Sequence, residues 1–370
     1  MPAAARVHFP SGSAFHADLK ARVQAYFDRT GRAPHGGGAI QRKTAVLAAW
    51  LLASYLLVLL APVGPLLAAL LTVSIGLAMA GIGFSVMHDA NHGSYSASPR
   101  VNRVMGFSID VLGASSHVWR HKHNILHHTY TNIAGLDTDI EASAMLRLAP
   151  SQPQRRFHRF QHLYIWALYC LFPLKWWFLD DARELASGKI AEHSFPPARG
   201  WTLWRALAAK AFFVGWAFVL PLALHPTWKL LPLWVLGIAT LGVVTSVVFQ
   251  LAHCVGAADF PVASKGGQMQ DGWAEHQIAT TVDFARRSRF LGWYLGGLNF
   301  QIEHHLFPRI SHVHYQAVSA IVQETCGDHG VAYSAEPTLW SALASNLRWL
   351  REMGSGPLEH RATVLTLQQR

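Results

Sequence analysis

Histidines gather in three short clusters of this chain, and neutral imidazole is a common ligand for iron, zinc and copper. The first cluster reads MHDANH (87–92), the second lies in WRHKHNILHHTYTN (119–132), and the third lies in NFQIEHHLFP (299–308). The second and third clusters each end in a His-His pair. The clustered residues are His88, His92, His123, His127, His128, His304 and His305. Such a pattern predicts a site for more than one metal ion.

The spacing within the clusters favours ligands on shared helix faces. Residues i and i+4 of a helix lie on one face, which is the spacing of His88 and His92 and of His123 and His127. His128 is expected to turn in a neighbouring direction. The adjacent pair at the end of the third cluster points apart, so each of its histidines can bind a different metal.

Acidic and amide side chains lie within or near the clusters and can support the ligands. A metal-binding histidine usually donates its second ring nitrogen to a carboxylate or a carbonyl oxygen. His253 joins the candidate ligands by position, because it ends an apolar segment as His88 does. His312 and His314 are interpreted as outer or surface residues. The candidates for ligand or supporting roles are Asp89, Asn91, Asn124, Asp137, Asp139 and Glu303.

Long apolar runs must position these clusters. Only 14% of the 370 residues are charged, and none is charged between residues 44 and 87. A membrane-spanning helix needs about 20 apolar residues, so this run holds two, separated by the Pro- and Gly-containing turn APVGP (61–65). A second apolar pair follows later in the chain. The predicted spans lie near 44–61, 66–87, 203–224 and 230–252.

Two helical hairpins would place all three clusters and both chain ends on one side of the membrane. The segment 161–179 is aromatic-rich and contains Pro173 and Lys175, so we interpret it as an interfacial helix. Arg and Lys flanking the first two spans place the shared side in the cytoplasm. We therefore predict an all-α integral membrane protein with a cytosolic helical cap holding a two-metal site. Its expected parts are a cytosolic segment 1–43, a membrane domain 44–360 and a tail 361–370.

The charge balance and the cysteines exclude other classes. The net charge is +10, but no basic stripe with interleaved aromatic residues points to nucleic acid. An anionic membrane surface or an acidic redox partner fits this charge better. The three cysteines form no Cys-x-x-Cys pair, which argues against an iron–sulfur or zinc-ribbon site.

These motifs resemble the three histidine boxes of the membrane fatty-acid desaturases, HxxxH, HxxxHH and (H/Q)xxHH. They stand here as 88–92, 123–128 and 301–305. The third box opens with Gln301 and in this respect resembles the third box of the front-end branch. Members of that branch act between an existing double bond and the carboxyl end of the acyl chain. Stretches such as RVMGFSIDVLG and GGLNFQIEHHLFPRISHVHY also resemble that branch, including its cyanobacterial acyl-lipid Δ6 enzymes. The resemblance covers most of the chain from about Met87 to Met353.

The resemblance implies a non-haem centre of two iron ions, ligated by the seven box histidines and by His253. Gln301 stands where relatives have histidine, and it would lie at the metals or just outside them. The implied reaction uses O₂ to form a cis double bond in a fatty acyl lipid or acyl-CoA, of linoleoyl or linolenoyl type. Such chemistry comes from the cofactor, while the protein supplies a dry apolar tunnel. Its expected wall residues are Trp119, Trp293, Tyr294 and Phe300.

The electron donor is expected to be a separate protein. Many eukaryotic front-end desaturases carry a cytochrome b5 domain with an HPGG motif, whereas the first 43 residues here are too few for one. The segment His35-Gly36-Gly37-Gly38 resembles that motif only superficially. A ferredoxin suits the basic cytosolic face, and a free cytochrome b5-like protein is the alternative. The expected location is a bacterial inner membrane.

Two other functions compete with desaturation. A membrane hydroxylase would use the same two-iron centre but return oxygen to the carbon. A non-enzymatic metal-binding or transport protein would place ligands near the middle of the spans. The middles of the four predicted spans hold no ionisable residue.

Overall fold

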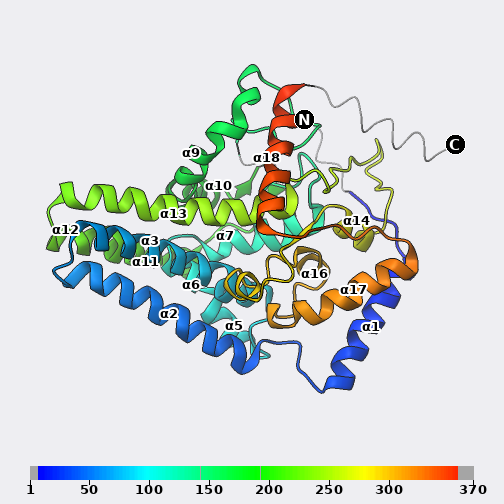
Figure 1. Ribbon diagram of the computed structural model, residues 1–370, viewed down its shortest axis with the longest axis horizontal. Helices are drawn as coiled ribbons and strands as arrows, with labels where there is room; N and C mark the ends of the chain where they lie inside the picture. Colours follow the sequence, from blue (N-terminus) through cyan, green and yellow to red (C-terminus); the bar gives the residue numbers. More distant parts are fainter. Residues whose placement is uncertain (1–6, 142, 192, 357–370) are drawn as a thin grey trace.

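The chain folds into a membrane-embedded bundle of long helices with a helical cap at one end (Figure 1). The computed structural model describes residues 7–141, 143–191 and 193–356. Four helices among the described residues are long and apolar enough to cross a membrane. The predicted fold class is confirmed. The predicted tail 361–370 lies outside the described residues.

The spans extend beyond the charge-free runs seen in the sequence. The first begins at Gly37 and therefore includes Lys43, which is buried, and the second continues to His92. Charge-free runs mark the hydrocarbon depth, whereas the helices continue into the polar boundary. The span elements are α2 (Gly37–Leu60), α3 (Pro65–Ile82) with α4 (His88–His92), α11 (Gly200–Val214) with α12 (Leu220–Leu224), and α13 (Thr227–His253).

Two tight hairpins join the spans, and both turns lie at the end of the bundle away from the cap (Figure 1). One turn separates Leu60 from Pro65, and the other separates Leu224 from Thr227. Helix α3 packs against both α2 and α13. Gly76 allows the close approach to α13, because a Cβ there would lie 2.9 Å from the Gly237 carbonyl oxygen. The ends of α4 and α13 that lie away from the hairpin turns therefore meet beneath the cap.

The cap is built from short helices and two small sheets. Helix α1 (Ala14–Thr30) packs against α17 (Tyr315–His329) through Phe15, Leu19 and Val23, so part of the predicted N-terminal segment belongs to the cap core. Strands β1 (Lys189–Ile190) and β2 (His193–Ser194) pair antiparallel, and β3 (Asp283–Phe284) and β4 (Ala335–Glu336) pair parallel. The remaining helices are α1 (Ala14–Thr30), α5 (Pro99–Gly106), α6 (Ser108–Val111), α7 (Ser116–His121), α8 (His128–Tyr130), α9 (Gln161–Leu174), α10 (Asp181–Ser187), α14 (Trp273–Ala279), α15 (Arg289–Tyr294), α16 (Gln301–Leu306), α17 (Tyr315–His329) and α18 (Leu339–Ser355).

The segment predicted as an interfacial helix forms α9 and a π-helical extension, Lys175–Asp180. It is not among the four helices with the length and hydropathy of a span. Helix α9 packs closely on α13, because Gly242 has no side chain and a Cβ there would lie 2.1 Å from the Tyr169 carbonyl oxygen. Leu163 and Leu171 on α9 remain exposed. This helix braces α13 from outside the four-helix bundle.

Candidate metal centre

The first two histidine clusters lie at π-helical turns. Gly83–Met87 forms one such turn directly before His88, and Lys122–His127 forms another within the second cluster. A π-helix bonds residue i to residue i+5, so residues five apart come close to one face. This geometry brings the Nε2 atoms of His123 and His128 to 3.3 Å of each other. His128 nevertheless turns in a neighbouring direction, as expected, because it groups with His304 and His305 rather than with His123 and His127.

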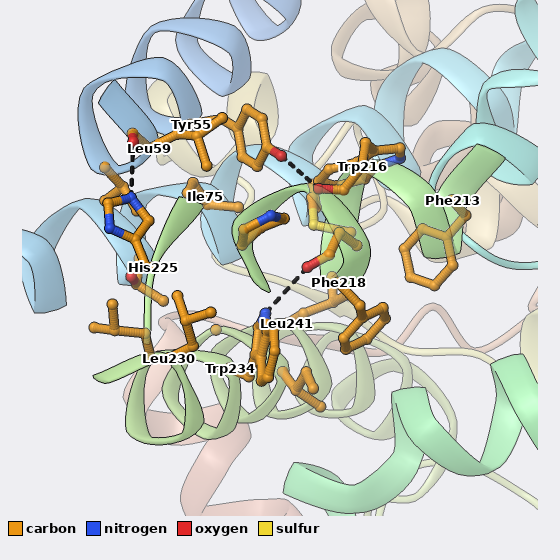
Figure 2. Close-up of a pocket in the computed structure, with 18 of the residues that line it drawn as sticks. Tyr55, Leu59, Ile75, Phe213, Trp216, Phe218, His225, Leu230, Trp234 and Leu241 are labelled. Atoms are coloured by element: carbon orange, nitrogen blue, oxygen red, sulfur yellow. Dashed lines mark hydrogen bonds between the residues drawn. The ribbon is translucent and has the colours of Figure 1, made fainter. Parts of the chain in front are cut away.

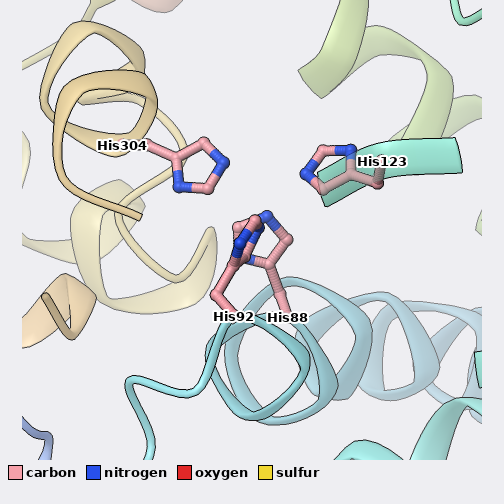
Figure 3. A group of neighbouring side chains, drawn as sticks. All are labelled: His88, His92, His123 and His304. Atoms are coloured by element: carbon pink, nitrogen blue, oxygen red, sulfur yellow. The ribbon is translucent and has the colours of Figure 1, made fainter. Parts of the chain in front are cut away.

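All eight predicted histidine ligands converge beneath the cap. The third cluster forms helix α16, and His253 is the last residue of α13. Figure 3 shows His88 and His92 rising from one helix, with His123 and His304 facing them from opposite sides. Within each compact group, one ligand atom from each residue lies within 4.8 Å of the others. The all-histidine groups are His88, His92, His123 and His304; His127, His253 and His305; and His128, His304 and His305.

The ring nitrogens of these histidines point to a role beyond packing. A buried polar nitrogen without a partner is costly, and native structures rarely contain one without reason. Five Nε2 atoms at the centre are buried and have no hydrogen-bond partner in the described part of the chain. They belong to His88, His92, His127, His304 and His305. This donor set fits metal ions bound in the shared space.

Partners on the outer side hold several rings in position. The Nδ1 of His127 lies 3.1 Å from both carboxylate oxygens of Asp137, and that of His305 lies 2.8 Å from Oε1 of Gln277. The Nδ1 of His304 lies 3.3 Å from the Tyr315 hydroxyl. An Nδ1–H that donates outward leaves the Nε2 lone pair free. Each of these three rings is therefore oriented for ligation.

Burial keeps most of these imidazoles neutral. Desolvation lowers the pKa of His128, His304 and His305 well below the ordinary value, and neighbouring imidazoles lower each pKa further. Burial opposes protonation of His127 as well, but the charge of Asp137 raises its pKa. A neutral imidazole presents a lone pair to a metal, whereas an imidazolium cannot. The neutral imidazoles of this site can therefore bind cations through their lone pairs.

The predicted supporting residues divide into two sets. Asp137 and Asp139 lie at the second cluster, with an Asp139 carboxylate oxygen 3.7 Å from Nδ1 of His123. The Gln301 amide lies 2.9 Å from Nε2 of His253. Asn124 donates to the backbone oxygen of Asn91 at 2.9 Å, which ties the first two clusters together.

The other predicted residues are engaged away from the ligand nitrogens. Asp89 accepts hydrogen bonds from Ser311 at 2.7 Å and from His312 Nδ1 at 2.9 Å. The Asn91 side chain donates to the backbone oxygens of Met87 and Gly106. Glu303 accepts from the Tyr333 hydroxyl at 3.0 Å. These three side chains join the clusters to the surrounding cap.

Sequence reasoning missed several residues that contact the candidate ligands. Gln277 and Thr131 both contact Nδ1 of His305, and Tyr315 contacts His304. Trp119, one of the expected tunnel wall residues, stacks on His123 with ring centroids 4.4 Å apart. Gln277 and Thr131 carry no motif of their own, so only the fold reveals their positions.

An apolar cavity of about 110 Å³ lies between the spans, towards the hairpin turns (Figure 2). Tyr55, Ile75, Phe213, Trp234 and Leu241 are among its lining residues. None of the four aromatic residues expected to line a tunnel lines this cavity. Met79 lines the cavity and belongs to the same hydrophobic core cluster as Trp119 at the histidines. Apolar packing therefore runs continuously from the cavity to the metal centre.

A π-helical turn, Gly215–Val219, shapes the cavity wall within the third span. Such a turn disturbs the regular helical hydrogen bonds. The Tyr55 hydroxyl donates to the Trp216 carbonyl oxygen, and Nε1 of Trp234 donates to that of Ala217 at 3.0 Å (Figure 2). At the far end, Nε2 of His225 bonds the Leu59 carbonyl oxygen at 2.8 Å. Polar groups in the wall are thus satisfied, and the interior remains apolar.

Comparison with known proteins gives close relatives over nearly the whole chain. The chain is 39% identical over 359 residues to an sn-1 linoleoyl-lipid 6-desaturase of Synechocystis sp., covering 96% of this chain and 99% of that protein. It is 36% identical over 357 residues to an sn-1 linoleoyl-lipid 6-desaturase of Arthrospira platensis, covering 95% and 96%. An acyl-lipid (8-3)-desaturase of Physcomitrium patens is 36% identical over 344 residues, covering 92% and 72%.

The sequence model of the fatty acid desaturase family matches residues 64–337, which contain all three histidine clusters and the last three spans. The match and the full-length relatives agree with the arrangement of apolar helices and converging histidines. The chain belongs to the fatty acid desaturase family.

Proposed function

We propose that this chain is an O₂-dependent fatty acyl desaturase of Δ6 type that forms a cis double bond on the carboxyl side of an existing one. The observation that carries the proposal is the set of unpartnered Nε2 atoms buried at the cap end of an apolar bundle. Linoleoyl-lipid 6-desaturases among the relatives support a linoleoyl or linolenoyl chain as substrate.

The proposed cofactor is a pair of iron ions. The four-histidine group with His88 would hold one iron, and the group with His127 and His253 would hold the other. His304 of the first group and His305 of the second form a further group with His128, which links the two sites. When bound, two irons supply the oxidising power from O₂ that removal of hydrogen from an unactivated methylene pair requires. The protein orients the ligands through Asp137 and Gln277 and keeps water away.

The cavity between the spans is the proposed site for the methyl end of the acyl chain. Met79 in its wall precedes His88 by nine residues on one continuous helix, a rise of about 13 Å. An acyl chain with its methyl end in the cavity would therefore place its carboxyl-side carbons beside the histidines. This arrangement suits oxidation close to the polar end of the substrate.

A separate protein is the proposed electron donor, and the metal end of the bundle is proposed to face the cytoplasm of a bacterial inner membrane. Arg100, Arg103 and Lys122 lie on the metal side of the second span and support this orientation. The positive charge of the chain suits an acidic ferredoxin. A free cytochrome b5-like protein is the alternative.

Expression in a host fed linoleate or α-linolenate tests the proposed reaction. Mapping of double bonds in the extracted lipids should reveal a new bond at carbon 6. Hydroxy fatty acids would instead identify the hydroxylase that uses the same ligands. With iron and a donor present, the absence of any oxidised product would remove the enzymatic proposal.

Filling the cavity should shorten the preferred acyl chain. Leu233 lines the cavity, so Leu233→Trp is expected to lower turnover of 18-carbon chains about tenfold relative to 16-carbon chains. Gas chromatography of products from paired substrates measures this ratio. Leu231→Trp is the control, since Leu231 lies on the same helix but is 60% exposed on its outer surface. An unchanged ratio in Leu233→Trp would place the acyl chain elsewhere.

A further inference from the structure

Helix α14 carries two side chains that contact different candidate ligands. Trp273 and Gln277 are one turn apart and therefore share a face of this helix. Oε1 of Gln277 lies 2.8 Å from Nδ1 of His305, and this contact orients the ligand ring. Nε1 of Trp273 instead donates to the backbone oxygen of His128 at 3.4 Å. The contact of Trp273 thus connects it to a ligand residue without orienting the imidazole.

Trp273 extends from the metal centre to the surface of the cap. Its side chain is partly exposed, whereas His128 is buried. His16 on α1 is also partly exposed, and its ring centroid lies 5.6 Å from that of Trp273. Helix α14 packs against both α1 and α16, and its Ala274 and Ile278 are buried in the core of the cap. Trp273 therefore forms a fixed connection between an accessible surface and a candidate ligand residue.

This surface lies where a soluble protein can reach it. Helices α1 and α14 lie at the end of the molecule opposite the two hairpin turns (Figure 1). A water-soluble partner can therefore approach Trp273 without entering the bilayer. Electron-transfer proteins dock through small and short-lived interfaces, so a few accessible side chains are enough for such an encounter.

The metal centre approaches the surface at a second place, beside His123. The side chains of His123 and Asp139 are 12% and 18% exposed. Leu126 in the same cluster packs with Leu185 on α10, and α10 continues from the interfacial helix α9 through the π-helical extension. This second opening therefore lies near head-group depth, where an acyl lipid approaches. Entry of electrons at Trp273 would leave that approach free for the substrate.

We propose that electrons from a reduced ferredoxin enter the metal centre through Trp273 and the backbone of His128. This inference rests on the proposed function, because O₂-dependent desaturation consumes two electrons from a separate donor. Two ferredoxins each lose one electron and are oxidised, and the two electrons reduce the pair of irons from ferric to ferrous. Electron tunnelling weakens steeply with distance, and a path of covalent and hydrogen bonds carries it better than a gap. Trp273 supplies such a path from the surface.

Anaerobic mixing of the ferric-loaded protein with reduced [2Fe–2S] ferredoxin tests this route. The visible absorbance of ferredoxin reports its reoxidation, and the parent protein should oxidise two ferredoxins per chain. Trp273→Phe keeps an aromatic ring but lacks the N–H donor, so it should slow this reoxidation about tenfold. Reduction by dithionite, a small molecule that needs no docking surface, should keep the parental rate. Iron content, and the affinity of the metal-free protein for oxidised ferredoxin, should also stay parental.

Trp340→Phe is the matched control, because Trp340 is 77% exposed on α18. Its rate with ferredoxin should equal that of the parent. A parental rate in Trp273→Phe would overturn the route and favour entry beside His123. Slowing of both ferredoxin and dithionite by the same factor would show damage to the iron site and would also overturn it. The assay contains no acyl lipid, so a failure of desaturation is detected separately, by the mapping of double bonds.

Discussion

Replacing His304 with alanine is expected to abolish turnover, with a fall of about a thousandfold or more. His304 belongs to two of the three all-histidine groups, and one of them is the proposed site of the first iron, so its loss should remove a ligand from that site. Its Nε2 is buried without a partner, and Nδ1 is held by Tyr315. Product formation and iron content of the purified variant, both measured against the parent protein, check this expectation.

A matched control separates metal loss from general damage to the fold. His158 is also buried, but its Nδ1 accepts from the Arg155 backbone N–H at 3.1 Å, and its Nε2 lies 3.2 Å from the Ala144 carbonyl oxygen. His158→Ala should lower thermal stability while the folded fraction keeps its iron. If His304→Ala retained parental turnover and iron, His304 would leave the ligand set.

Replacing Asp137 with asparagine is expected to cost about ten- to a hundredfold in iron affinity or activity. The Asp137 carboxylate fixes the ring of His127, and the same carboxylate accepts backbone N–H groups of Asn132 and Asp139 at 2.9 and 3.0 Å. Asparagine preserves the size but removes the charge and one acceptor. Competition with a calibrated iron chelator measures the affinity.

Asp181→Asn is the control for this substitution. Asp181 is another buried carboxyl, and burial raises its pKa to about 7. It lies 3.5 Å from Nζ of Lys210 and belongs to none of the groups that could hold a metal among the described residues. We expect its iron affinity to match the parent. An Asp137→Asn protein that also matched the parent would show that His127 is oriented without the carboxylate.

The apolar pattern of the sequence predicted the architecture because membrane insertion imposes a simple rule on composition. Charge-free runs and the Pro- and Gly-containing turn after Leu60 indicated two hairpins. The hairpins in turn brought His253 to the same end as His88. Two features of the sequence were sufficient to group the histidines. One is the helical spacing within the clusters, and the other is the position of the clusters at the ends of predicted segments.

Residues that depend on tertiary contacts could not be predicted in this way. Gln277 reaches His305 only because α14 packs against α16. The amino-acid composition did not indicate the π-helical turn that brings the rings of His123 and His128 together. Asp89 lies beside a histidine in the sequence, yet its carboxylate bonds Ser311 and His312 across the cap. Proximity in sequence therefore predicted a cluster, whereas the fold decided which atoms face its centre.

The iron content of the purified protein tests the two-metal centre most directly. Protein loaded with Fe(II) without oxygen and freed of loosely bound metal should contain two irons per chain, in nitrogen-rich sites by Mössbauer and X-ray absorption spectroscopy. One tightly bound iron, or none in a folded protein, would contradict the assignment of the converging histidines to a two-iron site.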